Sequence, residues 1–103
     1  MKNTYRIIWS ELALINLQEI VSYLEDRWTE KELRKFAQLL DKRLSSIERD
    51  PHLFPLINYS ENMRRSVLSK QTTIFYQVVN IDIRIICLFD NRQNPQRLKD
   101  QLL

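Results

Sequence analysis

Glycine is absent from this 103-residue sequence, so neither of the common glycine-rich phosphate-binding loops can be present. The only cysteine, Cys87, cannot form an internal disulfide, and it stands among apolar residues, as a buried structural thiol does. The only histidine, His52, lies in a loop without the neighbouring acids or cysteines of a catalytic or metal-binding pattern. The sequence therefore predicts no metal site, no cofactor and no catalytic triad.

Long apolar stretches are missing as well. The apolar runs have the length of strands, far below the roughly 20 residues that cross a bilayer. The first residues, Met1 to Arg6, are not followed by the apolar core of a signal peptide. A chain of this length has room for one hydrophobic core. We expect a single cytoplasmic domain over residues 1–103 that makes no use of a membrane.

The small positive charge is unevenly distributed along the chain. Lysine and arginine number 16 against 13 acidic residues, which gives a net charge of +3. The two signs balance up to residue 60, so the surplus lies from residue 61 onward. Most of the bases there are arginines, which suit bidentate contacts with phosphate or carboxylate. This placement favours an anionic partner, while ordinary surface charge on a small domain remains the alternative.

Two helices are predicted in the first half of the chain. After a strand over Lys2–Trp9, Ser10 offers an N-cap to a helix whose apolar residues recur every three or four positions. These residues are Ala13, Leu17, Ile20, Val21, Leu24 and Trp28. Thr29 and Glu32 have the spacing of a capping box and begin a second helix, which ends before Pro51. Because the connection is so short, the two helices should form an antiparallel hairpin.

Three strands are predicted in the second half, over Met63–Ser69, Thr72–Val79 and Ile83–Phe89. Residues 80–82 connect the last two as a hairpin, and residues 96–103 form a short amphipathic tail. The fold class is therefore α+β in the order β-α-α-β-β-β. The helical hairpin should pack on one face of an antiparallel sheet.

The connecting segments carry two further expectations. The loop over residues 51–62 should be held to the core by three apolar side chains, namely Phe54, Leu56 and Ile57. In the absence of glycine, left-handed turn positions must fall to asparagine or aspartate. The candidates are Asn80, Asp82, Asn91 and Asn94.

The predicted strands are apolar on both sides. Ile74 and Tyr76 alternate with Phe75, and in the last strand Ile85 and Cys87 alternate with Ile86. Two helices can cover only one face of such a sheet, so the other face needs a second cover. The tail could supply a little of it, and a partner chain is the stronger candidate.

Four arginines remain as candidate site residues. Arg64 and Arg65 begin one strand, Arg84 begins the last one, and Arg92 follows it. In an antiparallel meander Arg65 and Arg92 should converge at one end of the sheet, with Arg84 toward the opposite end. They either keep the strand ends in solvent and guard the edges, or form a site for nucleic acid or an acidic partner.

A set of segments covers nearly the whole chain in the order found in one protein family. They are Tyr5-Arg6-Ile7-Ile8-Trp9-Ser10 leading to Ala13, Leu17 to Leu24 with Trp28, Ile47 with Asp50-Pro51, Phe54-Pro55, Arg64-Arg65, Ile74-Phe75-Tyr76, and Asp90 to Pro95. With these segments the chain resembles the RelE/ParE superfamily of bacterial toxins from type II toxin–antitoxin systems, most closely its ParE-like branch. The fold that this resemblance implies agrees with the one predicted above.

The resemblance implies one of two activities. RelE-like members cleave messenger RNA in the ribosomal A site, using basic residues on the central strands and a C-terminal tyrosine or histidine. By strand register, Arg65 falls near a family lysine and Arg92 on the family arginine, so these two are the catalytic candidates. However, the arginine of the middle strand corresponds to about Thr73, and no tyrosine or histidine follows Arg92.

ParE-like members are associated with poisoning DNA gyrase, and the incomplete cleavage set favours this branch. The implied partners are a cognate antitoxin, whose C-terminal segment would lie on the exposed sheet and hairpin surface, and gyrase, or alternatively the ribosome with mRNA. A member that binds its antitoxin without being toxic is a third interpretation. In each case the candidate partner- or nucleic-acid-binding residues are Arg64, Arg65, Arg84 and Arg92.

Overall fold

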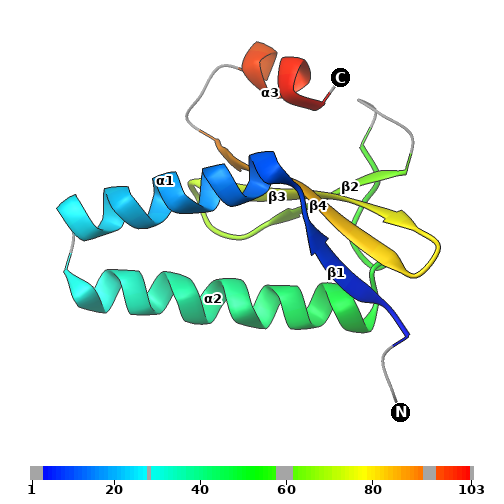
Figure 1. Cartoon of the computed structure of the whole chain (residues 1–103), viewed down its shortest axis with the longest axis horizontal. Coiled ribbons are helices and arrows are strands. Elements are labelled where there is room, and N and C mark those ends of the chain that lie inside the picture. The colour runs from blue at the N-terminus through cyan, green and yellow to red at the C-terminus, as the bar shows by residue number, and fades with distance from the viewer. Residues whose placement is uncertain (1–3, 28, 58–61, 92–94, 103) are drawn as a thin grey trace.

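The structure is a computed structural model that describes residues 4–27, 29–57, 62–91 and 95–102. Its elements are β1 (Arg6–Trp9), α1 (Glu11–Arg27), α2 (Glu30–Arg49), β2 (Met63–Val67), β3 (Thr72–Val79), β4 (Asp82–Asp90) and α3 (Pro95–Leu102) (Figure 1). The predicted β-α-α-β-β-β order is confirmed, with the tail forming α3. Predictions for Trp28, Arg92 and Asn94 fall outside the described residues. No helix in the described ranges is long and apolar enough to cross a membrane.

The strands form one sheet in the order β1-β4-β3-β2. The last three make the predicted antiparallel meander, but β1 joins β4 in parallel, so that Ile7 lies beside Ile83 and Trp9 beside Ile85. The sheet is therefore mixed rather than wholly antiparallel. The reason is that β1 reaches the sheet through two helices, and such a crossover does not impose the antiparallel direction that a tight hairpin does.

The turn between β3 and β4 uses asparagine where a glycine would be expected. Asn80 has a φ of 56°, as predicted, and Asn62, which the sequence analysis did not single out, has a φ of 59° before β2. Asp82 and Asn91 were also candidates, but neither has a positive φ. Asp82 instead has extended backbone, because it pairs with Val79 in the ladder. Asparagine is the residue after glycine that enters this region most readily.

The two long helices begin differently. The Ser10 hydroxyl accepts a hydrogen bond from the Ala13 N–H at 3.0 Å, which is the predicted N-cap. At the start of α2, Thr29 has extended backbone but makes no side-chain cap, so the predicted capping box is wrong. Its carbonyl oxygen instead accepts from the Glu32 N–H at 3.0 Å. This end of α2 is exposed, and its first N–H groups can be solvated without a side chain.

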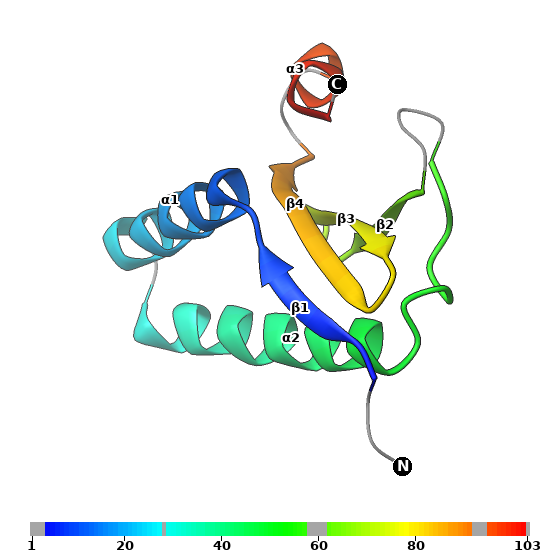
Figure 2. The ribbon, with the colours of Figure 1, turned by 45° about the vertical axis from the view of Figure 1, so that its right-hand side comes forward.

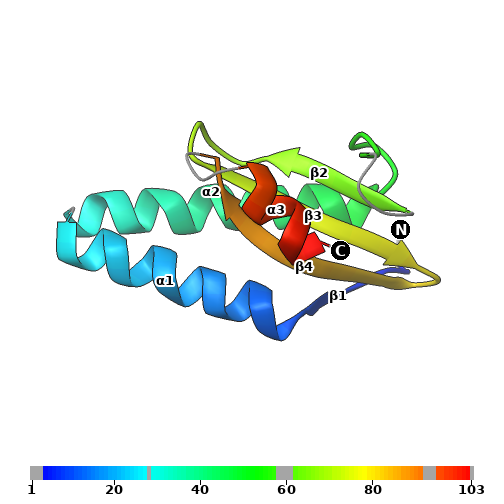
Figure 3. The same ribbon diagram turned by 90° about the horizontal axis from the view of Figure 1, so that it is seen from above.

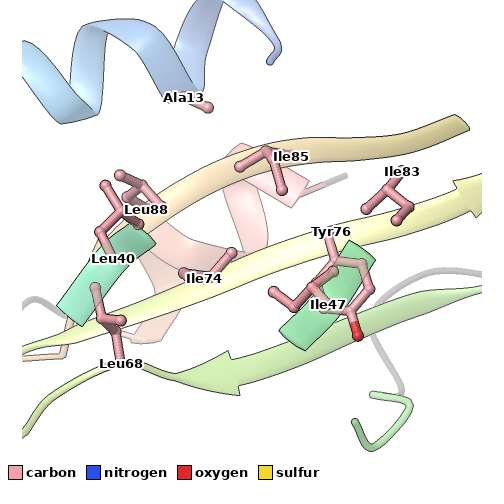
Figure 4. Close-up of a cluster of buried hydrophobic side chains, with 9 residues drawn as sticks. All are labelled: Ala13, Leu40, Ile47, Leu68, Ile74, Tyr76, Ile83, Ile85 and Leu88. Atoms are coloured by element: carbon pink, nitrogen blue, oxygen red, sulfur yellow. The ribbon is translucent and has the colours of Figure 1, made fainter. Parts of the chain in front are cut away.

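The main core lies between the helical hairpin and one face of the sheet (Figure 4). Its buried members come from α1, α2, β3, β4 and the turn after β2, and are Ala13, Leu40, Ile47, Leu68, Ile74, Tyr76, Ile83, Ile85 and Leu88. Phe54 packs against them, as predicted, whereas Leu56 is 58% exposed and does not hold its loop to the core. The predicted single-face cover by two helices is confirmed.

The opposite face of the sheet carries a second apolar cluster. Met63, Phe75, Cys87 and Phe89 are buried there together with Leu98 of α3. The predicted shared face of Ile85 and Cys87 is wrong, because a register shift between Phe75 and Tyr76 puts Ile85 in the main core and Cys87 in this cluster. Figure 3 shows α3 lying across the strands at this face. Over this part of the sheet the chain's own C-terminal helix therefore supplies cover, which the sequence predicted only in small measure, and a contribution from a partner stays a prediction.

Candidate functional site

The neighbouring arginines of β2 point to opposite faces of the sheet. Arg64 pairs with Tyr76 on the side of the main core, and its Nη1 donates to the carbonyl oxygens of His52 at 3.2 Å and Phe54 at 2.7 Å. This side chain ties the loop after α2 to the sheet. Arg65 lies on the other face, is exposed, and pairs with Phe75.

Arg65 and Arg84 share the sheet face that is opposite the helical hairpin. Arg84 is exposed and pairs with Gln77, two residues along β3 from the partner of Arg65. They are therefore only about 7 Å apart along the strand direction. Arg84 lies near the β3–β4 turn and away from the Asp90 end of β4, as predicted. Arg65, however, lies opposite Phe75 in the middle of β3 and not at an end of the sheet. Arg92 and its predicted approach to Arg65 lie outside the described residues.

A fifth arginine, which the sequence analysis did not consider as a site residue, has the most contacts. Arg43 of α2 donates from Nη1 to the Ser66 hydroxyl and to the Val67 carbonyl oxygen, both at 2.6 Å, and its guanidinium lies 5.7 Å from the centre of the Phe54 ring. The sequence holds one indication of this role, because Arg43 lies beside the apolar stripe of α2, between Leu40 and Ile47. It joins α2 to the edge of the sheet.

Two groups that could act in acid–base or nucleophilic chemistry, Cys87 and Tyr76, are held in unreactive states. Burial raises the pKa of the Cys87 thiol to about 12, so it stays protonated. Burial also raises the pKa of Tyr76 to about 12, and its hydroxyl donates to the Pro51 carbonyl oxygen at 2.8 Å. Within the described ranges, no three metal-ligating side chains come together.

The position of Thr73 bears directly on RNA cleavage. Its side chain is 4% exposed, and its hydroxyl donates to Oδ1 of Asn91 at 2.7 Å. On the same sheet face, Phe75 and Phe89 pack edge to face with ring centres 6.5 Å apart. The surroundings of Thr73 are therefore apolar and partly covered, while the exposed arginines of this face, Arg65 and Arg84, lie farther along β3, beside Phe75 and Gln77.

A concavity lies where the helical hairpin projects past the sheet. It has a volume of about 420 Å³ and is walled by α1, α2, the β2–β3 turn, β4 and α3. Ile20, Phe36 and Leu88 supply apolar surface, and Tyr23 and Leu39 are among the large apolar side chains that remain exposed. Its charged lining residues are Glu19, Glu32, Lys35, Asp90 and Arg97. An apolar floor with charges of both signs is typical of a protein-binding groove.

Comparison with known proteins gives two kinds of match. Over residues 7–95 the sequence matches the family described as the ParE toxin of the type II toxin–antitoxin system parDE. A structure of the chromosomal ParDE system from P. aeruginosa is similar with a TM-score of 0.68 and 14% identity, covering 86% of this chain and 98% of that one. No curated protein sequence matches.

Two E. coli structures have the same fold at lower similarity. A chain of the DinJ–YafQ toxin–antitoxin complex aligns with a TM-score of 0.53 and 12% identity, over 84% of this chain and 92% of that one. YafQ alone aligns with a TM-score of 0.51 and 12% identity, over 84% and 93%.

The fold is that of the RelE/ParE superfamily of type II toxins, as the sequence predicted. Within this superfamily the chain belongs to the ParE toxin family, because the family match spans most of its length. It is accordingly the toxin of a type II toxin–antitoxin system, and a cognate antitoxin is the partner that this family implies.

Proposed function

We propose that this toxin acts by binding and inhibiting DNA gyrase, and that it does not cleave RNA. The observation that carries the proposal is the sheet face around Thr73. A ribonuclease of the RelE type needs cations there to bind phosphate and stabilise the transition state. Here Thr73 is buried and bonded to Asn91, and its neighbours form the apolar cluster that Leu98 partly covers. Arg65 and Arg84 also lie on this face, but neither takes the place of a cation at Thr73, so the set of groups that RNA cleavage needs is incomplete.

The experiment compares the two activities in one preparation. Purified toxin is added to gyrase with relaxed plasmid, and separately to translating ribosomes with a reporter mRNA. We expect inhibition of supercoiling and intact mRNA. Ribosome-dependent cleavage that is lost in Arg65→Ala and Arg92→Ala would overturn the proposal in favour of RNA cleavage. No effect in either assay, and none on growth, would identify a binding-only member.

The neutralising antitoxin is proposed to occupy the 420 Å³ groove between the hairpin and the sheet. The exposed side chains of Tyr23 and Leu39 suit the apolar face of an amphipathic segment, and the groove's acids and bases suit complementary charges on its polar face. The groove is proposed in place of the second sheet face, which the sequence suggested as the antitoxin's binding surface, because α3 already covers part of that face.

A matched pair of variants tests this location. The toxin is co-expressed with the product of the neighbouring small open reading frame, and complex formation is measured by co-purification. Leu39→Glu places a charge in the groove and should weaken the complex at least tenfold. Leu53→Glu is the control, because Leu53 is 67% exposed and is not among the groove residues. Equal weakening by both, or by neither, would contradict the location.

A further inference from the structure

One face of α2 carries bases and no acids. Lys31, Lys35, Lys42 and Arg49 are all exposed, and at 3.6 residues per turn they fall within about 40° of one another around the helix axis. We call these four residues the basic stripe. The side chains of α2 that enter the core, Leu40 and Ile47, project roughly 140–180° away from it. The stripe therefore faces away from the sheet. Figure 2 shows α2 running below α1 and the strands β3 and β4.

The acids of α2 are kept off this face. Glu30, Glu32, Asp41 and Glu48 all project from other sides of the helix. Within the described part of the chain, the ion pairs join Arg6 to Asp82 and Arg34 to Glu30, so no stripe residue is neutralised by one. The stripe is therefore a line of positive charge about 27 Å long, from Lys31 to Arg49, that has no ion-pair partner among the residues the structure describes.

The residues between the charges indicate the kind of partner. Gln38 and Ser45 lie along the stripe and are exposed hydrogen-bonding side chains, and no aromatic residue lies on it. A protein partner would need an apolar or aromatic anchor, and single-stranded nucleic acid would need aromatic platforms for its bases. Lysine, arginine, serine and glutamine together are the side chains that contact the phosphates of duplex DNA.

We propose that the basic stripe of α2 binds the phosphate backbone of double-stranded DNA without reading its sequence. Duplex DNA carries a negative charge about every 1.7 Å of its axis, so a straight helix of this length can meet several phosphates at once. The basic stripe and the groove are separate surfaces, because Lys35 is the only one of the four stripe residues that also lines the groove. It is also independent of gyrase and of the antitoxin.

The test measures binding of the full chain to a fluorescently labelled 20-base-pair duplex by anisotropy, between 50 and 200 mM salt. Four phosphate contacts predict a slope of about −3.6 for log affinity against log salt, hence a roughly 150-fold loss over this range. The variant Lys31→Gln/Lys42→Gln/Arg49→Gln should bind more weakly at every salt concentration and lose only about 3- to 4-fold. It retains Lys35, so the groove is unaltered.

A control variant removes the same charge elsewhere. Arg27→Gln/Lys70→Gln/Arg84→Gln also lowers the net charge from +3 to 0, and all three positions are exposed, outside α2 and outside the groove. It should keep at least half of the wild-type slope. Equal losses in the two variants would overturn the proposal, because binding would then follow net charge alone.

Alternative probes complete the test. A single-stranded oligonucleotide, a duplex RNA and a poly-glutamate peptide are each titrated under the same conditions. The proposal predicts weaker binding to all three than to the DNA duplex. Tighter binding to any of them would reassign the stripe to that class of partner and overturn the proposal. Because no gyrase or antitoxin is present, failure here leaves the proposed toxin activity untouched, and the reverse also holds.

Discussion

The guanidinium of Arg43 lies 2.6 Å from the carbonyl oxygen of Val67, so a helix side chain occupies a position on the edge strand where a further strand would bond. The start of the same edge is occupied by the loop before β2. There the Ile57 N–H donates to the Met63 carbonyl oxygen at 2.9 Å, and the Arg65 N–H donates to Pro55 at 3.1 Å. An edge that is covered in this way resists pairing with other chains.

Replacing Arg43 should therefore destabilise the fold more than an exposed arginine does. Arg43→Met keeps the length of the side chain but removes both of its 2.6 Å hydrogen bonds, which predicts a loss of about 2–3 kcal/mol in the free energy of unfolding. Arg34→Met breaks only an exposed ion pair with Glu30 and should cost less than about 0.5 kcal/mol. Urea denaturation of both variants measures the difference, and similar midpoints would refute this role of Arg43.

The unequal helix starts give a second prediction. Ser10→Ala removes a cap and also the hydrogen bond that the hydroxyl donates to the Ile86 carbonyl oxygen at 2.7 Å, so it should cost about 1–2 kcal/mol. Thr29→Ala removes no side-chain cap and should change stability by less than about 0.5 kcal/mol. Thermal or urea unfolding distinguishes the two. A large loss for Thr29→Ala would mean that its hydroxyl caps α2 after all.

A third prediction concerns the cover of the second sheet face. Leu98 is 8% exposed and is the described α3 side chain in that cluster, so Leu98→Ala should cost about 2 kcal/mol. It should also increase binding of a hydrophobic fluorescent dye, because Phe75 and Phe89 lose part of their cover. Arg97→Ala, at the exposed neighbouring position, is the control. Unchanged dye binding in Leu98→Ala would show that α3 is not needed there.

The buried tyrosine predicts a particular alkaline response. The pKa of Tyr76 is about 12 in the folded protein and 10 in the unfolded chain, so the neutral form is favoured by folding. This contribution is complete below pH 10 and is lost as the pH rises toward 12. Tyr76→Phe lacks it, as well as the bond to Pro51.

The measurement is the free energy of unfolding of both proteins at pH 8 and pH 11. At pH 8 the wild type should be more stable by about 1 kcal/mol because of the hydrogen bond. By pH 11 the wild type should have lost about 1.4 kcal/mol relative to Tyr76→Phe, so the order reverses. Cys87 shifts in the same direction but is present in both proteins and cancels. A constant difference would show that Tyr76 ionises normally.

The features that the sequence predicts well are those with local causes. The bounds of β3, Thr72–Val79, follow from a run of β-branched and aromatic residues, and the end of α2 follows from Pro51. The features that it misses depend on distant contacts. Nothing near β1 indicates that it runs parallel to β4, and nothing near Leu98 indicates which sheet face it covers.

The candidate site shows the same division. The arginines were identified from their positions, but their roles depend on the faces to which they point. Adjacent in sequence, Arg64 ties a loop to the sheet and Arg65 is exposed on the opposite face. Arg43 was missed because its partners, Ser66 and Val67, lie 23 and 24 residues away along the chain.

The parallel pairing of β1 also sets a condition on biosynthesis. Arg6 is bonded to Asp82, 76 residues later, so the first strand leaves the ribosome long before its neighbour exists. Contacts between such distant residues form late, because the intervening loop must be closed first. A nascent chain that stops before β4 has two helices and an unpaired first strand. The completed sheet, and with it any toxic surface, can therefore exist only once nearly the whole chain has been made.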